Sequence, residues 1–187
     1  MQVLETEIPA VKVLVPKKFG DHRGFFSEVF SRKAAADAGI TADFIQDNHS
    51  LSVEKGVVRG LHYQLPPNAQ DKLVRVIRGA IRDVAVDIRR GSPTFGQSVS
   101  VLLSADNHRL FWIPEGFAHG FVVLSERAVF HYLCTAPYKR EDDAGVRWDD
   151  ARLAIDWPVS EPLLSGKDAG LPFLDEIAPE RLPEMRA

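Results

Sequence analysis

The sequence is poor in cysteine, with one such residue, Cys134, among its 187. A single thiol excludes an intrachain disulfide, and low cysteine content is typical of proteins from reducing compartments. The N-terminus lacks the basic and then apolar pattern of a signal peptide. No apolar stretch approaches the roughly 20 residues that span a bilayer. We therefore expect a cytoplasmic protein that does not enter a membrane.

An excess of positive charge is also missing. The 23 lysines and arginines are outnumbered by 26 aspartates and glutamates, and the net charge is −3. Proteins that bind nucleic acids or membrane surfaces usually carry a surplus of basic residues, so we expect neither partner. A local group of cations would still suit a small anion. The length and the 45% apolar content predict one domain over residues 1–187, with a sizeable core.

Helical patterns are scarce. One in the first half follows Ser31, a residue type suited to the N-cap, covers residues 32–38 and stops at Gly39. From residue 44 to 135, short β-rich runs separated by turn signals predict strands at 44–52, 57–64, 72–78, 80–89, 97–103, 110–113, 120–124 and 128–135. Many short strands at this spacing indicate an all-β sandwich or barrel, most simply a jelly roll.

The two ends of the chain differ from this middle part. Residues 2–15 are strand-like, with Pro9 at an edge or a break. Residues 19–24 read as a turn and residues 25–30 as a second strand. After residue 138 the chain becomes polar and then irregular and rich in proline. This predicts a wrapping tail with at most a short helix.

The stretch 56–64, GVVRGLHYQ, is an apolar strand that carries an arginine and a histidine. Arg59 is a candidate anion holder and His62 a candidate base, although a lone strand histidine is more often a hydrogen-bonded core residue. By strand alternation, His62 and Gln64 share one face and Arg59 lies on the other. A bulge at Gly60 would bring Arg59 round to the face of His62. The sequence leaves both arrangements open.

Histidines in a jelly roll raise the question of a metal-binding cupin. The first cupin motif is a glycine, five residues and then His-x-His, and Gly56 and His62 fit its start. Gln64 stands where the second histidine would be, and no glutamate follows at positions 68 and 69. His119 completes the second motif, Pro-x-Gly-x-x-His. One ligand from each motif is too few for a stable site, so we expect no metal and a His62 free to act as a base.

Tyr132 lies on the strand predicted over residues 128–135, on the same face as Phe130 and Cys134. A strand tyrosine usually serves packing, and Cys134 reads as a small buried hydrophobic residue. If this face points inward, however, Tyr132 places a weak acid in the cavity of His62. Removal and return of a proton on opposite faces of a carbon atom requires two such groups.

Eight ordered blocks make the sequence similar to a known family. They are DHRGFF (21–26), QDNHS (46–50), GVVRGLHYQ (56–64), KLVRV (72–76), DVAVDIR (83–89), SPTFG (92–96), IPEGFAHGF (113–121) and YLCT (132–135). The chain resembles the dTDP-4-dehydrorhamnose 3,5-epimerase family over nearly its whole length. The resemblance implies a metal-free cupin jelly roll, that is, a double-stranded β-helix, which works as a homodimer without a cofactor.

The resemblance also implies a reaction. The substrate would be dTDP-4-keto-6-deoxy-D-glucose, epimerised at C3 and C5 to dTDP-4-keto-L-rhamnose for dTDP-L-rhamnose or related deoxysugar biosynthesis. A mono-epimerase of a specialised dTDP-deoxysugar pathway is the alternative. A non-catalytic sugar-nucleotide binder or a metal cupin is a third hypothesis.

The resemblance assigns roles to single residues. His62 would be the base, Lys72 would stabilise the enolate at the C4 oxygen, and Tyr132 would return the proton from the opposite face. Asp168 would orient His62. Asp83 and Asp87 remain rival partners of His62 from the sequence alone.

The substrate-binding set follows from the same resemblance. Arg23 and Arg59 would hold the diphosphate, since arginine suits bidentate phosphate contacts. Phe19 and Tyr138 would stack on thymine. The residues expected around the nucleotide and sugar are Glu28, Gln46, Asp47, Asn48, His119 and Lys167. The chain departs from the family pattern at Asp143, where a glutamate is usual, and a proline is lost nearby; both put the local loop geometry in question.

Overall fold

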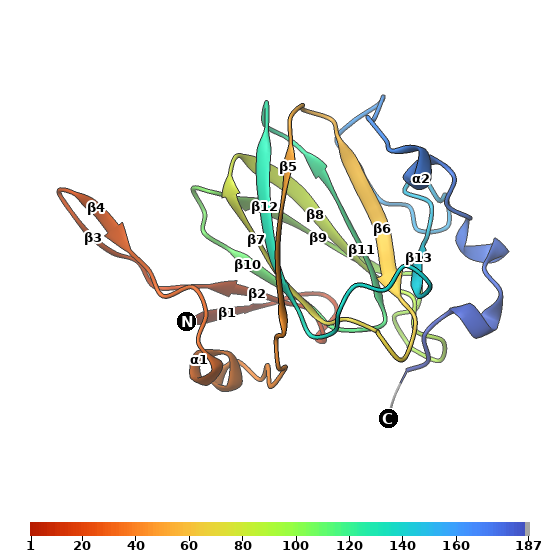
Figure 1. The fold of residues 1–187 in the computed structure, drawn as a ribbon, viewed down its shortest axis with the longest axis horizontal. Coiled ribbons are helices and arrows are strands. Elements are labelled where there is room, and N and C mark those ends of the chain that lie inside the picture. Colours follow the sequence, from red (N-terminus) through yellow and green to blue (C-terminus); the bar gives the residue numbers. More distant parts are fainter. Residues whose placement is uncertain (186–187) are drawn as a thin grey trace.

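Two antiparallel sheets face each other in the computed structural model, which describes residues 1–185 (Figure 1). The larger sheet has the order β1 (Gln2–Glu5), β2 (Lys12–Val15), β10 (Leu110–Ile113), β7 (Lys72–Arg78), β12 (Ala128–Cys134) and β5 (Gln46–Ser52). The smaller has the order β13 (Asp143–Gly145), β6 (Val58–Gln64), β11 (Phe117–Val123), β8 (Ala80–Asp87) and β9 (Ser98–Ser104). Because the chain alternates between the sheets along most of its path, the cupin-type jelly roll is confirmed.

Apolar side chains of both sheets fill the space between them. Phe111 and Val74 of the larger sheet and Ile81 of the smaller one are fully buried there. Phe121 and Phe130 link the sheets by stacking, with ring centroids 4.6 Å apart. Full burial of one such side chain contributes about 1.5–3 kcal/mol. This core occupies part of the sandwich, and the open part beside β5 and β6 is left for polar side chains.

The C-terminal tail covers the outer face of the smaller sheet. Leu61 and Val84 point outward there and pack against Leu153, Leu174 and Ile177 of the tail. The tail contains α2 (Gly166–Ala169) and two short 3₁₀ turns, Leu174–Glu176 and Pro179–Arg181. The expected wrapping tail with a short helix is confirmed. Its path matters for function because α2 lies against β6 (Figure 1).

A hairpin near the N-terminus leaves the body of the molecule. It consists of β3 (Phe19–Asp21) and β4 (Gly24–Phe26), and Figure 1 shows it as an arm. The three phenylalanines of this hairpin are each more than half exposed. The predicted strand over residues 25–30 is wrong beyond Phe26, because the following residues lead into α1 (Arg32–Asp37), whose first turn Ser31 caps. The helix predicted over residues 32–38 is confirmed.

Most strands of the middle part lie where alternation predicted them. β11 begins earlier than expected, at Phe117, and β13 was not predicted, because its three residues lie in a polar stretch. No helix within residues 1–185 combines the length and hydropathy that a membrane crossing requires. The single domain over residues 1–187 stays a prediction, and its last two residues lie outside the described part.

Candidate active site

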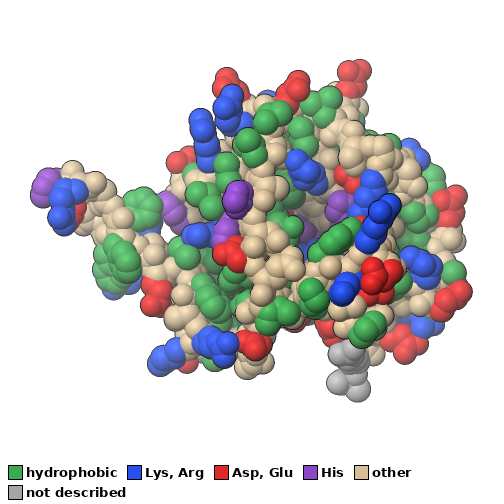
Figure 2. Space-filling view, viewed as in Figure 1, with side chains coloured by type: hydrophobic (Ala, Val, Ile, Leu, Met, Phe, Trp, Pro, Cys, Tyr) green, Lys and Arg blue, Asp and Glu red, His purple; other side chains and the backbone are tan. Residues whose placement is uncertain are grey.

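A cavity of about 330 Å³ opens between the two sheets. Small-molecule sites usually enclose roughly 300–1,000 Å³. The surface is hollowed between β5 and β6, and basic and histidine side chains gather at this hollow (Figure 2). The ionisable side chains that line it are Arg59, His62, Lys72, His119, Tyr132, Lys167 and Asp168. The structure therefore brings all four residues predicted to be catalytic into one cavity.

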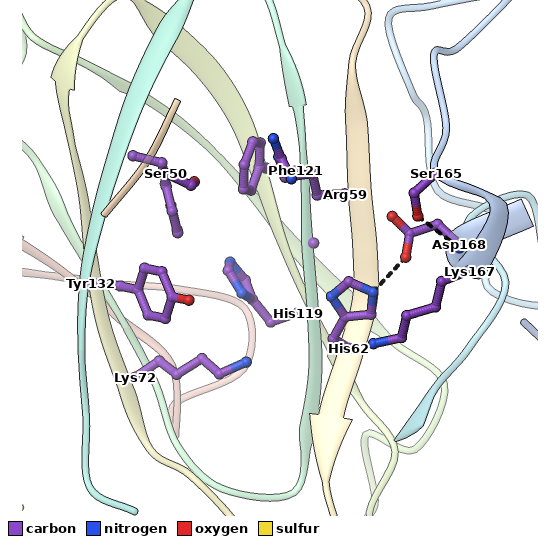
Figure 3. Close-up of a pocket in the computed structure, with 12 residues that line it drawn as sticks. Ser50, Arg59, His62, Lys72, His119, Phe121, Tyr132, Ser165, Lys167 and Asp168 are labelled. Atoms are coloured by element: carbon purple, nitrogen blue, oxygen red, sulfur yellow. Dashed lines mark hydrogen bonds and ion pairs between the residues drawn. The ribbon is translucent and has the colours of Figure 1, made fainter. Parts of the chain in front are cut away.

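His62 lies on the inner face of β6 and is held by α2 (Figure 3). Its Nε2 atom lies 2.6 Å from Oδ1 of Asp168, a carboxylate that is almost fully buried. Ser165 caps α2 and accepts a hydrogen bond from the backbone N–H of Asp168 at 3.1 Å. The second ring nitrogen of His62 faces the cavity (Figure 3). This arrangement fixes the ring and leaves one nitrogen for proton transfer.

The pKa of Asp168 suits its contact with an imidazole. Burial alone would raise that pKa, but the hydrogen bond and charge of His62, with help from Ser165 and Lys167, hold it below its ordinary value. An ionised carboxylate supports a protonated imidazole. The rival partners are engaged elsewhere, Asp83 with His119 and Asp87 with its own loop.

Arg59 reaches the cavity of His62 because β6 carries a bulge. In the pairing of β6 with β11, His62 is opposite His119 and Arg59 is opposite Phe121, so three steps on β6 match two on β11. Gly60 adopts a φ of +115°, and a Cβ there would lie 2.6 Å from backbone atoms of β11. The extra residue reverses the strand alternation. The bulge that the sequence left open is therefore present, and Arg59 and His62 share a face.

The guanidinium of Arg59 spans the mouth of the cavity. Its Nε donates a hydrogen bond to the Ser52 hydroxyl at 3.1 Å, and an Nη atom donates to the Leu51 carbonyl at 3.2 Å. Both partners belong to β5, so Arg59 links the two sheets at their open edge. A guanidinium has five N–H donors, and those that remain suit an anion at the opening.

Tyr132 and Lys72 come from the wall opposite His62 (Figure 3). Burial, with a smaller contribution from the neighbouring Cys134, raises the pKa of Tyr132, so its hydroxyl stays protonated at neutral pH. Burial lowers the pKa of the Lys72 ammonium, and the neighbouring Cys134, Asp83 and Asp143 oppose that shift. An acid and a cation thus face a base across the cavity.

His119 is the direct cross-strand neighbour of His62, on β11. Its Nε2 atom lies 2.8 Å from Oδ1 of Asp83, and both residues are buried. Side chains directly opposite each other on antiparallel strands lie on the same face, roughly 4.5–5.5 Å apart at Cβ. Two histidines, each with its own aspartate, therefore stand side by side on one wall.

A second hollow of about 380 Å³ adjoins the first and shares His62, Lys72, Tyr132 and Lys167 with it. It adds four of the residues expected to bind substrate, Gln46, Asn48, Tyr138 and Asp143. The Tyr138 hydroxyl donates a hydrogen bond to Asp143 at 3.0 Å, and Lys167 forms an ion pair with the same carboxylate. The shorter aspartate at position 143 thus contacts both Tyr138 and Lys167, and its equivalence to the usual glutamate stays a prediction.

Four expected binding residues lie away from both hollows. Phe19 and Arg23 belong to the exposed arm, where Arg23 pairs with Asp21. Glu28 accepts a hydrogen bond from Ser31 at the start of α1. Asp47 points to the outer face of the larger sheet, where its Oδ1 lies 2.7 Å from Nε2 of His131. Strand alternation explains this last position, since its neighbours Gln46 and Asn48 point inward.

Sequence reasoning missed several lining residues. Ser50 follows Gln46 and Asn48 on the inner face of β5, so the two-residue period carried a signal for it. Ser165 precedes α2, and only the position of that short helix brings it to the cavity. Cys134 is buried, as expected, but it also lines the second hollow. Within residues 1–185, no group of three or more histidine, cysteine, aspartate or glutamate side chains could hold a metal ion.

Comparison with known proteins places these residues in a family. Residues 5–176 match the family described as dTDP-4-dehydrorhamnose 3,5-epimerase. A curated protein of that name from Shigella flexneri is 55% identical over 177 residues, which cover 94% of this chain and 97% of that protein.

Solved structures agree with this match. A dTDP-6-deoxy-D-glucose-3,5-epimerase from Legionella pneumophila, in complex with dTDP-4-keto-L-rhamnose, superimposes with a TM-score of 0.95 at 52% identity. The superposition covers 100% of this chain and 99% of that one. A 3′-monoepimerase from Streptomyces bikiniensis, in complex with dTDP-quinovose, has a TM-score of 0.87 at 34% identity and covers 96% and 92%.

Proposed function

This chain belongs to the dTDP-4-dehydrorhamnose 3,5-epimerase family, and from that premise we propose that it inverts C3 and C5 of dTDP-4-keto-6-deoxy-D-glucose. The product is dTDP-4-keto-L-rhamnose, a precursor in dTDP-L-rhamnose or related deoxysugar biosynthesis. The chain is thus an isomerase. One observation carries the proposal: His62 and Tyr132 face each other from opposite sheets across a cavity of sugar-nucleotide size (Figure 3).

The reaction begins with removal of a proton beside a ketone. The hydrogens at C3 and C5 are adjacent to the C4 carbonyl, so their loss gives an enolate. His62 takes each proton on its cavity-facing nitrogen, while Asp168 on the other nitrogen stabilises the imidazolium. The ring is held from behind by a helix rather than by a loop, which keeps the base at one position.

Lys72 and Tyr132, on the cavity wall opposite His62, complete the epimerisation. The Lys72 ammonium stabilises the negative charge that develops on the C4 oxygen, an effect that contributes roughly 3–4 kcal/mol in comparable sites. Tyr132 then donates its proton to the carbon from the face away from His62. Because base and acid stand on different sheets, removal and return occur on opposite faces of the sugar, which inverts the centre.

The remaining cavity residues bind the nucleotide. Arg59 at the mouth holds the diphosphate, and His119 contacts the sugar beside His62. The second hollow takes the nucleoside, with Tyr138 against thymine. The residues that would complete this subsite are Gln46, Asn48, Asp143 and Lys167.

We also propose a homodimer, in which a partner subunit would cover the apolar side chains of the exposed arm. Three exposed phenylalanines on one hairpin favour a protein contact. β5 is an edge strand of the larger sheet, with one side of its backbone open to another strand. In a dimer, Phe19, Arg23 and Glu28 act on the substrate of the partner subunit. The cytoplasmic location stays a prediction, as does a binding role for Asp47.

Single-carbon epimerisation is the competing function, since the 3′-monoepimerase from Streptomyces bikiniensis shares the fold at 34% identity. Incubation of the purified protein with dTDP-4-keto-6-deoxy-D-glucose, followed by NMR of the product, separates the two. We expect the L-rhamno configuration, with inversion at both C3 and C5. Inversion at one centre would select the monoepimerase. No turnover by a folded dimer, or full turnover by His62→Asn, would reject the proposal.

A further inference from the structure

The buried carboxylate of Asp83 has a role that the proposed chemistry has not used. Asp83 lies on β8 and is fully buried. One carboxylate oxygen, Oδ1, lies 2.8 Å from Nε2 of His119. The other oxygen, Oδ2, has no hydrogen-bond partner within the described residues. A buried polar atom without a partner costs about 1–3 kcal/mol, so its retention calls for a physical reason.

The position of Asp83 supplies that reason. β8 belongs to the same sheet as β6 and β11, and the sequence of side chains along this wall is His62, His119 and then Asp83. Lys72 extends from the facing sheet toward the β11 side of the cavity (Figure 3). Lys72 and His119 line the same cavity, and the unpartnered Oδ2 belongs to the carboxylate that contacts His119. The charge of Asp83 acts to raise the pKa of Lys72, and the charge of Lys72 acts to lower the pKa of Asp83.

Several other ionisable groups surround Lys72. Cys134 lies opposite it on β12, with a thiol whose pKa burial raises to about 11, so the thiol is neutral at physiological pH. Tyr132, two residues earlier, is neutral as well. Asp143 of β13 is already paired with Lys167 of α2, which leaves little net charge from that side. His62 of β6 is paired with Asp168. Asp83 is therefore the nearby carboxylate that keeps one oxygen without a hydrogen-bond partner within the described residues.

We infer that Asp83 is a positioning residue of the epimerase reaction, which acts through two neighbours. With one oxygen it fixes the ring of His119, and with the charge of its free oxygen it keeps the Lys72 ammonium protonated. The inference rests on the proposed function. It names a residue that touches neither the substrate nor the reacting atoms, and it gives the two histidine–aspartate pairs different tasks.

The ionised form of Asp83 is the one that fits these contacts. Burial raises the pKa of Asp83, and the charges of His119 and Lys72 act against that shift. A neutral carboxyl would carry an O–H group, and Oδ2 has no acceptor for it. The carboxylate instead presents this oxygen to a cation. Conversely, without that charge the enclosed Lys72 would lose its proton more readily, and a neutral amine stabilises an enolate poorly.

The variant Asp83→Asn tests this, because asparagine keeps an acceptor for His119 and removes only the charge. We expect the alkaline limb of the pH profile of kcat to move to lower pH by about 1–3 units, the effect of one nearby opposite charge. The KM should change by a smaller factor than kcat. Asp87→Asn is the matched control: Asp87 is equally buried on β8, but its partners are Arg89, Ser92 and Thr94, outside the cavity. In Asp87→Asn, the alkaline limb of the pH profile of kcat should stay at the wild-type pH.

A direct titration complements the kinetics. NMR of the protein labelled with ¹³C at lysine Cε, with the Lys72 signal assigned by its absence from Lys72→Arg, reports the protonation of Lys72. We expect a charged Lys72 at neutral pH in the wild type and a lower pKa in Asp83→Asn. An unchanged pH profile in a folded Asp83→Asn protein, or a neutral Lys72 in the wild type, would overturn the inference. Failure of the wild type to epimerise would instead reject the proposed function, so the two failures are distinguishable.

Discussion

At the scale of single residues, the proposed epimerisation depends on protonation states that the surroundings of Asp168 and Tyr132 impose. Asp168 is held ionised, which suits a carboxylate behind a base. Tyr132 is held protonated, which suits a donor. Burial raises the pKa of Tyr132, whereas contacts with His62, Ser165 and Lys167 lower the pKa of Asp168 in spite of its burial. The same cavity therefore contains a histidine backed by a carboxylate and, on the facing sheet, a protonated tyrosine, as epimerisation requires.

Tyr132→Phe removes the proposed proton donor and keeps the aromatic ring. We expect kcat to fall by a factor on the order of 100 or more, since positioned acids usually contribute that much. Binding of dTDP should weaken far less, because the donor acts only in the transition state. Steady-state kinetics and calorimetric titration with dTDP measure the two effects. Equal losses in both would show that Tyr132 serves binding or folding instead.

Single residues also show how far the sequence could be interpreted. His62, Lys72 and Tyr132 could be found because a polar residue in an apolar strand is unusual, and family blocks surround each one. The partner of His119 could not be found, since Asp83 and Asp87 lie four positions apart on β8 with apolar residues between them and look alike in the sequence. The register of β8 against β11 does not separate them either, because both lie two residues from Ala85, which is opposite His119. Only the contact of Nε2 of His119 with Oδ1 of Asp83 identifies the partner.

At the scale of elements, the bulge in β6 decides the geometry of the site. Strand alternation alone puts Arg59 and His62 on opposite faces. The extra residue at Gly60 puts them on the same face, and the close approach of β11 leaves no room for a side chain there. Gly60 in the sequence suggested a bulge, but the register of β6 could be determined only from its pairing with β11. The strand predicted over residues 25–30 was wrong beyond Phe26, because its aromatic and polar residues alternate much as they do in a strand.

Gly60→Ala should disrupt this element. The left-handed φ costs about 1–2 kcal/mol for any residue with a Cβ, and the contact with β11 adds roughly 1–3 kcal/mol of overpacking. Gly91→Ala is the control, since Gly91 has a φ of +81° and nothing within 4 Å of the added Cβ. Urea denaturation should show a larger loss of unfolding free energy for Gly60→Ala, together with weaker dTDP binding. Equal losses in the two variants would mean that the close approach is not energetically important.

At the scale of the whole molecule, one chain brings together only part of the predicted substrate-binding set. The cavity holds Arg59 and the proposed catalytic side chains, while Phe19 and Arg23 extend into solvent on the arm (Figure 1). Family resemblance predicted both groups as substrate contacts, and no motif or spacing indicated that they lie far apart within a chain. A dimer in which each arm reaches the neighbouring cavity reconciles the two facts.

Mixing two inactive variants tests this arrangement. His62→Ala lacks the base, and Arg23→Ala lacks the arm cation. If Arg23 acts on the partner subunit's substrate, a mixed dimer contains one complete site, formed by the base of one chain and the arm of the other. Activity should therefore rise well above the average of the two variants after subunit exchange. An activity equal to that average, with exchange verified by native mass spectrometry, would contradict the shared site.

In the proposed mechanism, one base, His62, and one acid, Tyr132, on facing sheets invert two carbons of a dTDP-4-keto sugar. Incubation with dTDP-4-keto-6-deoxy-D-glucose in D₂O tests it most directly, because each inversion takes its new hydrogen from an acid that exchanges with solvent. We expect deuterium at both C3 and C5 of the product with the wild-type protein, and no incorporation with His62→Asn. Deuterium at one carbon alone, or at neither, would contradict it.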